Sequence, residues 1–252
     1  MSSPVYAQPQ YTHERSIIAD RTLLRLSATL LFVGELLSLL VGLLHPAHEN
    51  PNNHSAAFAE YAASANWTAV HLGQFAGMAV IIAGLLVLFF ALNVHAGTAG
   101  WAGRFAAVSA VVTLALYGVL QAVDGVALKQ AVDAWASAPA AEKVARFASA
   151  EAIRWLEWAV RSYQSFMFGL ALVLFAVAMV WTARIPRLIG YLMGLSGLTY
   201  LVQGWILGSE GFSATNTIPQ LLAYLFVFAW SIWLLILAWR MKELVEVSKE
   251  PY

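Results

Sequence analysis

Six long apolar runs constrain this chain more than any other feature of its sequence. They span residues 22–44, 67–92, 102–124, 155–182, 187–207 and 218–239. An α-helix needs about 20 apolar residues to cross the hydrocarbon core of a bilayer, and each run reaches that length. Only 11% of the residues are charged, whereas soluble domains carry about 25%. We therefore predict an all-α, polytopic membrane bundle of six transmembrane helices.

The runs form one domain with a polar segment at either end. We expect a cytoplasmic tail at 1–21, a single six-helix transmembrane domain at 22–243 and a second cytoplasmic tail at 244–252. The first tail lacks the basic and apolar regions of a signal peptide. The segment between the first and second spans (the 1–2 connection) and the segment between the third and fourth spans (the 3–4 connection) both have amphipathic stretches, so we predict short helices in each. In the 3–4 connection we predict two helices, which are separated at Pro139 and lie on the outer leaflet.

Basic residues in the flanks predict the orientation. Nine lie on the side of the two termini: Arg15, Arg21, Arg25, Arg104, Arg184, Arg187, Arg240, Lys242 and Lys249. Four lie on the opposite side: Lys129, Lys143, Arg146 and Arg154. Cytoplasmic flanks carry an excess of lysine and arginine. We therefore predict a multi-pass protein of the cell (inner) membrane with both termini in the cytoplasm.

Polar intramembrane residues concentrate in the outer half of the predicted spans. Residues three or four apart share one side of a helix, and the polar residues form stripes of that spacing. The candidate pocket residues on these stripes are Glu35, His71, Gln74, Gln121, Asp124, Arg154, Glu157 and Arg161. A charged group that faces lipid costs about 2.5–3.5 kcal/mol. We therefore expect the stripes to face the bundle and to border one pocket that opens outward.

Glu35 is the hardest of these residues to explain as structural. It lies in the apolar stretch "FVGELLSLL" (32–40), with no basic residue near it in the sequence. A carboxylate in a transmembrane segment is a functional candidate by default. We expect Glu35 to form the pocket floor and to find its partner among Arg161, His71 and Gln74. The blander interpretation of the other stripes is that glutamines join helices and that ion pairs form along one helix.

The sequence contains no motif that identifies a metal or cofactor site. The loop histidines His45, His48 and His54, with Glu49 nearby, have ligand chemistry that suits a borderline metal. Their segment "HPAHENPNNH" contains two prolines and fixes no geometry, so we predict a solvated loop and no metal site. The chain has no cysteine, which excludes disulfides and thiolate ligands. Its net charge is zero, so no basic face for nucleic acid is expected.

Four stretches, "VHLGQFAGM", "LQAVDGVALKQAVDAW", "AEAIRWLEW" and "GSEGF", resemble a group of uncharacterised bacterial, in particular actinobacterial, membrane proteins. The resemblance covers most of the chain and implies a free-standing multi-helix membrane protein with no activity to transfer.

Three functions remain open. The first is binding or transport of a small amphiphile or ion in an outward-opening pocket. The second is a membrane-embedded enzyme with acid–base or metal chemistry at Glu35, Asp124, Glu157 and His71. The third is an accessory subunit of a membrane complex. The expected partners are the lipid bilayer and a small amphiphilic ligand, whereas the cofactor and the oligomeric state are not indicated.

Overall fold

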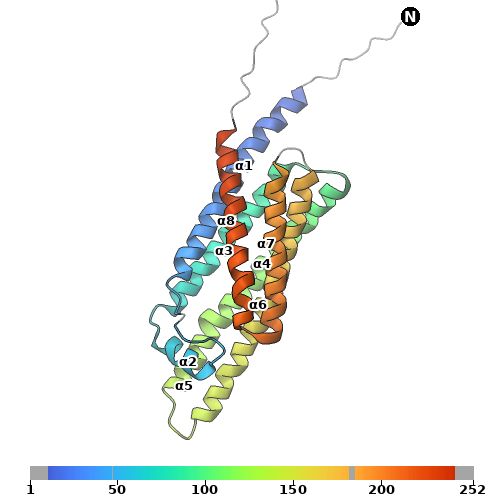
Figure 1. Ribbon diagram of the computed structural model, residues 1–252. Coiled ribbons are helices and arrows are strands. Elements are labelled where there is room, and N and C mark those ends of the chain that lie inside the picture. The colour runs from blue at the N-terminus through green and yellow to red at the C-terminus, as the bar shows by residue number, and fades with distance from the viewer. Residues whose placement is uncertain (1–10, 47, 182–184, 242–252) are drawn as a thin grey trace, which may run out of the picture.

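A computed structural model describes residues 11–46, 48–181 and 185–241 of the chain. Its regular elements in these ranges are all helical (Figure 1). The first helix begins at Tyr11, so part of the predicted tail at 1–21 is helical. Residues 1–10 and 242–252 lie outside the described residues, as do Arg184 and the side chains of residues 11–20. The predictions that fall there stay predictions.

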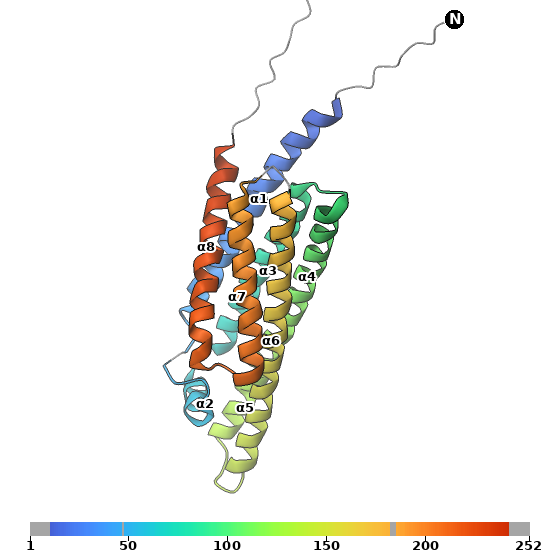
Figure 2. The ribbon, with the colours of Figure 1, turned by 45° about the vertical axis from the view of Figure 1, so that its right-hand side comes forward.

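In the part of the chain that the structure describes, six long helices form a ring. They are α1 (Tyr11–Gly42), α3 (Trp67–Leu92), α4 (Gly97–Ala122), α6 (Lys143–Trp181), α7 (Arg187–Glu210) and α8 (Thr217–Arg240). In space α1 packs on α3, α3 on α4, α4 on α6, α6 on α7, α7 on α8 and α8 on α1. The start of α1 and the end of α8 lie at one end, the terminal end (Figures 1 and 2). The short helices α2 (His54–Ala63) and α5 (Lys129–Ala136) lie at the opposite end, the loop end.

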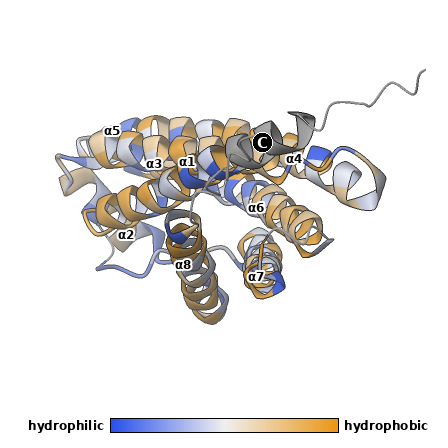
Figure 3. Cartoon of the chain, turned by 90° about the horizontal axis from the view of Figure 1, so that it is seen from above, coloured by the Kyte–Doolittle hydropathy of each residue, from blue (hydrophilic) through white to orange (hydrophobic). Residues whose placement is uncertain are grey.

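Within the described ranges, five helical segments are long and apolar enough to cross a membrane. They are Arg21–Gly42, Trp67–Leu92, Gly97–Ala136, Lys143–Trp181 and Ala214–Arg240. Many large apolar side chains on them are exposed, among them Leu72, Phe105 and Leu221, and much of the ribbon of the long helices has the orange colour of hydrophobic residues in Figure 3. A surface of this kind suits lipid, which indicates a membrane-embedded protein. The sixth predicted span, α7, carries five glycines and several polar residues and is not among the five, so the six-span count stays a prediction.

The terminal half of the bundle is packed with apolar side chains. Its core includes Leu31, Leu88, Phe175, Met179 and Leu234, all almost fully buried. The buried charged residues of the described ranges are Glu35, Arg154 and Glu157, and the concentration of polar groups in the outer half of the spans stays a prediction.

Glycines bring α6 and α7 into backbone contact. A Cβ atom added to Gly169 would lie 2.6 Å from the carbonyl oxygen of Gly197, and one added to Gly197 would lie 2.7 Å from that of Gly169. Small residues of this kind allow membrane helices to approach closely and to gain van der Waals contact.

The 3–4 connection differs from the prediction of two separate helices on the outer leaflet. A π-helical turn, η1 (Val123–Leu128), joins α4 directly to α5, and the second predicted helix is the first part of the 39-residue α6. The chain turns between the two at residues 137–142, around Pro139. The amphipathic faces pack on each other and on α2, where they bury Phe58, Leu128 and Val132. Burial within the protein therefore replaces the predicted contact with lipid.

Candidate metal centre

The π-helical turn η1 positions the first residue of the site. It opens the hydrogen-bond ladder between α4 and α5, and side chains of α3 bind two of its carbonyl groups. Trp67 Nε1 donates to the carbonyl oxygen of Asp124 at 2.9 Å, and Thr68 Oγ1 donates to that of Gly125 at 3.1 Å. Single π-helical turns inside α-helices are frequent at functional sites.

Gly125 brings α3 close to this turn. A Cβ atom added there would lie 2.5 Å from the Cβ atom of His71, so no larger residue fits without a shift. The close approach places His71 Nε2 3.0 Å from Asp124 Oδ2. The sequence pair Asp124-Gly125 thus supplies both a carboxylate and the space for the imidazole beside it.

Two histidines present their Nε2 atoms through the same arrangement. The Nδ1 atom of His71 lies 2.7 Å from the carbonyl oxygen of Trp67, and that of His45 lies 2.7 Å from the carbonyl oxygen of Pro46. A carbonyl only accepts, so each Nδ1 carries the proton and each Nε2 of a neutral ring keeps a lone pair. Metal-binding histidines almost always donate their other N–H in this way. Burial lowers the pKa of His45, although Asp124 opposes the shift, so this ring is neutral at pH 7.

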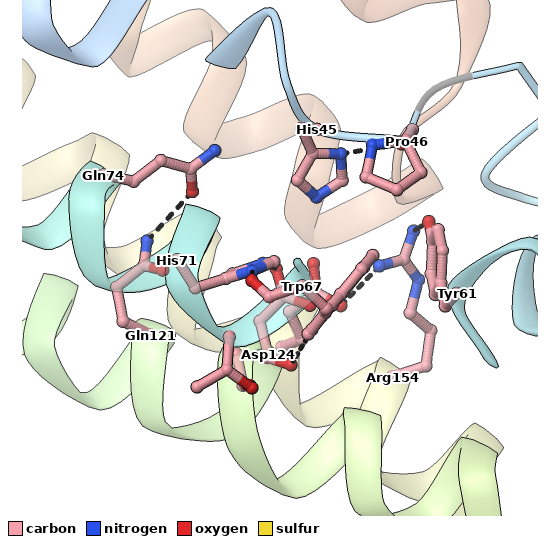
Figure 4. A network of polar contacts seen from close by, with 12 residues as sticks. His45, Pro46, Tyr61, Trp67, His71, Gln74, Gln121, Asp124 and Arg154 are labelled. Carbon is pink, nitrogen blue, oxygen red and sulfur yellow. Dashed lines mark hydrogen bonds and ion pairs between the residues drawn. The ribbon is translucent and has the colours of Figure 1, made fainter. Parts of the chain in front are cut away.

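The ligand atoms converge. His45, His71 and Asp124 each contribute one ligand atom, and these three atoms lie within 4.8 Å of one another. Figure 4 shows the His45 ring nitrogen that does not contact Pro46 turned toward His71 and Asp124. The His71 Nε2 and Asp124 Oδ1 atoms are buried without a hydrogen-bond partner in the described structure. His71 Nε2 lies near Asp124 Oδ2 but does not make an aligned hydrogen bond to it. Buried polar atoms are normally satisfied, so this arrangement has capacity for a bound ion.

A buried ion pair between Arg154 and Glu157 lies beside the centre, as the place of Arg154 in Figure 4 shows. Arg154 Nη1 donates to Glu157 Oε2 at 2.5 Å, and both side chains are almost fully buried. The same guanidinium donates to the Tyr61 hydroxyl at 3.3 Å and to the carbonyl oxygen of Pro51 at 3.4 Å. Burial raises the pKa of Tyr61 to about 12, so its hydroxyl stays protonated. The centre and its surroundings thus hold two carboxyl groups, those of Asp124 and Glu157, and one guanidinium, that of Arg154.

The expectation of a solvated loop is wrong for His45. Its ring centre lies 4.9 Å from that of Trp67 and 5.2 Å from that of His71. By contrast, His48 is exposed and bonds to Glu60. His45 was missed as a ligand because no local pattern shows that the chain folds back over α3 after α1 ends. The available signals were its ligand chemistry and its helical spacing from Glu35 through positions 38, 42 and 45.

Contacts among the described residues link six of the eight candidate pocket residues to the centre or to its neighbours. Five of them lie together in Figure 4: His71, Gln74, Gln121, Asp124 and Arg154. The sixth, Glu157, pairs with Arg154. Gln121 Nε2 donates to Gln74 Oε1 at 3.5 Å. Within the described part of the chain, no hydrogen bond or ion pair joins Glu35 or Arg161 to these six residues. The described residues therefore give no support for one pocket that all eight border.

Glu35 has a different partner from those that the sequence suggested. It is 5% exposed, so the predicted burial is confirmed. Its Oε2 atom accepts a hydrogen bond from Ser231 Oγ at 2.5 Å, which joins α1 to α8. Among the described residues, no ion pair or hydrogen bond joins Glu35 to Arg161, His71 or Gln74.

We predict that Ser231→Ala destabilises the protein by about 1–3 kcal/mol, because the buried carboxylate loses its donor. Glu35→Gln should cost less, since an amide oxygen still accepts from Ser231. Thermal unfolding in detergent would measure both. A Ser231→Ala variant as stable as wild type would show that this bond does not hold α1 against α8.

The fold and the polar centre together define a membrane-embedded helical bundle with a buried cluster of ionisable groups at its loop end. The family described as "Domain of unknown function (DUF4386)" matches residues 74–238, more than half of the chain. The chain therefore belongs to this family, in agreement with the resemblance to uncharacterised membrane proteins. The search of curated proteins and that of solved structures gave no match. The matched segment contains Asp124, Arg154 and Glu157, whereas His45 and His71 precede it.

Proposed function

We propose that the protein binds a divalent transition-metal ion at His45, His71 and Asp124. The observation that carries this proposal is the convergence of three ligand atoms within 4.8 Å, with both imidazoles oriented by backbone carbonyls. This is the ion-binding form of the function expected from the sequence, and it replaces the expectation that no metal is bound.

The ligand set indicates which ions suit the site. Imidazole nitrogen favours zinc, copper, iron and nickel, whereas calcium and magnesium prefer oxygen alone. Ligands at about 2.0–2.2 Å from one tetrahedral zinc ion lie about 3.3 Å apart. The His71–Asp124 pair, at 3.0 Å, is already near this separation. The ligand atoms that are furthest apart are separated by at most 4.8 Å. They would have to approach each other by about 1–1.5 Å to bind one zinc ion.

Three protein ligands leave one tetrahedral position for water or a substrate, as in catalytic zinc sites. This favours a second candidate function, a membrane-embedded metal-dependent enzyme. A metal titration alone does not separate the two functions. Hydrolysis of ester or amide probes that requires the added metal, and that Asp124→Asn abolishes, would favour the enzyme.

We also propose that the centre faces the outside of the cell membrane. The nine-to-four distribution of basic residues supports this orientation, with six spans and both termini in the cytoplasm. A periplasm-only reporter fused after Tyr252 should be inactive. Strong reporter activity there would reverse the orientation and place the centre on the cytoplasmic side.

The metal proposal is tested by titration of untagged protein in detergent after treatment with a chelator. Calorimetry with Zn²⁺ or Co²⁺ should show one ion per chain. His71→Ala should weaken binding by more than about 100-fold, since even outer-shell changes cost 10- to 100-fold. Asp124→Asn, which keeps the shape of the side chain, should also weaken it strongly.

His48→Ala is the matched control, because His48 is an exposed histidine of the same loop that bonds to Glu60. It should leave the affinity unchanged. Equal affinity in wild type and His71→Ala would contradict the proposed site, and so would a large loss in His48→Ala alone.

A further inference from the structure

A second arginine of α6 has surroundings unlike those of Arg154. Arg161 lies two helical turns further along, about 10 Å by the rise of an α-helix. Arg154 bonds to a carboxylate, a hydroxyl and a carbonyl oxygen. For Arg161, no described carboxylate lies within the 4.0 Å of an ion pair.

Three tyrosines from three other helices lie within electrostatic range of this guanidinium. Tyr117 of α4, Tyr224 of α8 and Tyr200 of α7 are the groups that act on it electrostatically. The guanidinium carbon lies 5.9 Å from the centre of the Tyr117 ring. Tyrosine hydroxyls donate as well as accept hydrogen bonds, so the cluster offers donors without a negative charge of its own. Glu35 lies within electrostatic range of Tyr200.

The depth of Arg161 matches that of lipid headgroups. It lies 20 residues before Trp181, the exposed last residue of α6, which is about 30 Å along the helix and about the thickness of the hydrocarbon core. Tyr163, on the same level of α6, is 66% exposed, as expected for an interfacial aromatic residue. Tyr224 is 44% exposed, so the cluster reaches the outer surface of the bundle.

We propose that Arg161, with Tyr117, Tyr200 and Tyr224, binds the phosphate or carboxylate group of an anionic amphiphile. No described carboxylate pairs with Arg161, and an anionic group at this depth would balance its charge. Guanidinium groups bind phosphate and carboxylate through paired N–H donors, to which the tyrosine hydroxyls would add. This inference rests on the Arg161 cluster alone and does not depend on the metal centre.

The test measures lipid binding by the full chain in detergent with native mass spectrometry. The probes are phosphatidylglycerol, oleate, phosphatidylcholine and inorganic phosphate. Wild type should bind the two anionic amphiphiles more tightly than phosphatidylcholine. Arg161→Gln should weaken that binding by about 10- to 100-fold, the range for hydrogen bonds to a charged group. Binding of inorganic phosphate as tight as that of the amphiphiles would overturn the assignment to an amphiphile.

Arg146→Gln is the matched control, because Arg146 is an exposed arginine of the same helix that pairs with Glu142. It should leave binding unchanged. If Arg161→Gln does not fold, the double variant Tyr117→Phe/Tyr200→Phe keeps both rings and removes two hydroxyls, and it should weaken binding of the anionic amphiphiles. Retention of the wild-type preference in Arg161→Gln or, failing that, in the double variant would overturn the proposal.

Discussion

Arg154→Ala should destabilise the protein by about 3–5 kcal/mol, because the substitution leaves the buried carboxylate of Glu157 without its partner. In a domain of this size that lowers the unfolding temperature by on the order of 10 °C. The variant also loses the bonds that join α6 to Tyr61 and to Pro51. Thermal unfolding in detergent, followed by far-ultraviolet circular dichroism, would measure the change.

The control removes both charges. Arg154→Met combined with Glu157→Gln should be more stable than Arg154→Ala, since no uncompensated buried charge remains. Arg146→Ala, which breaks an exposed pair on the same helix, should change stability by about 1 kcal/mol or less. An Arg154→Ala variant that unfolds at the wild-type temperature would mean that the pair does not hold the loop end together.

Gly169→Val should have the second large effect, because the added side chain would push α6 away from α7. Its Cβ atom alone would lie 2.6 Å from the carbonyl oxygen of Gly197, and backbone atoms cannot rotate aside as side chains do. Overpacking of this kind costs about 1–3 kcal/mol or more. We expect less folded protein in the membrane and a broader peak in size-exclusion chromatography.

Gly118→Ala is the corresponding control, since a Cβ atom there meets only Phe75, at an ordinary 3.4 Å. It should fold at least as well as wild type, because alanine favours helix over glycine. If Gly169→Val behaves like Gly118→Ala, the close backbone contact between α6 and α7 is not needed for folding.

Periodic features were predictable from the sequence, because they depend on residues close together in the chain. Apolar runs gave the positions of the long helices, although the structure extends α1 and α6 well beyond the predicted spans. Helical spacing suggested ion pairs along one helix as the blander interpretation of the stripes, and the bond between Arg154 and Glu157 is such a pair. The position of Glu35 in an apolar run predicted its burial, which the structure confirms.

Features that depend on contacts between distant segments were not predictable. Glu35 bonds to Ser231, which lies 196 residues away, so no local spacing could identify it. His45 follows the end of α1, where the chain direction is set by packing on Trp67 and His71. The π-helical turn at Asp124 has no known periodic signal in one sequence, yet it brings the carboxylate to His71. The candidate centre thus consists of residues whose proximity appears only in the fold.

Metal-edge X-ray absorption tests the central claim most directly, because it measures the atoms around a bound ion. Untagged protein would be loaded with one equivalent of Zn²⁺ in detergent and compared with His71→Ala. We predict four light-atom ligands at about 2.0–2.1 Å, with the outer-shell scattering of two imidazoles, and the loss of at least one imidazole in His71→Ala. A wild-type spectrum without imidazole scattering, or one that His71→Ala leaves unchanged, would contradict a metal centre at His45, His71 and Asp124.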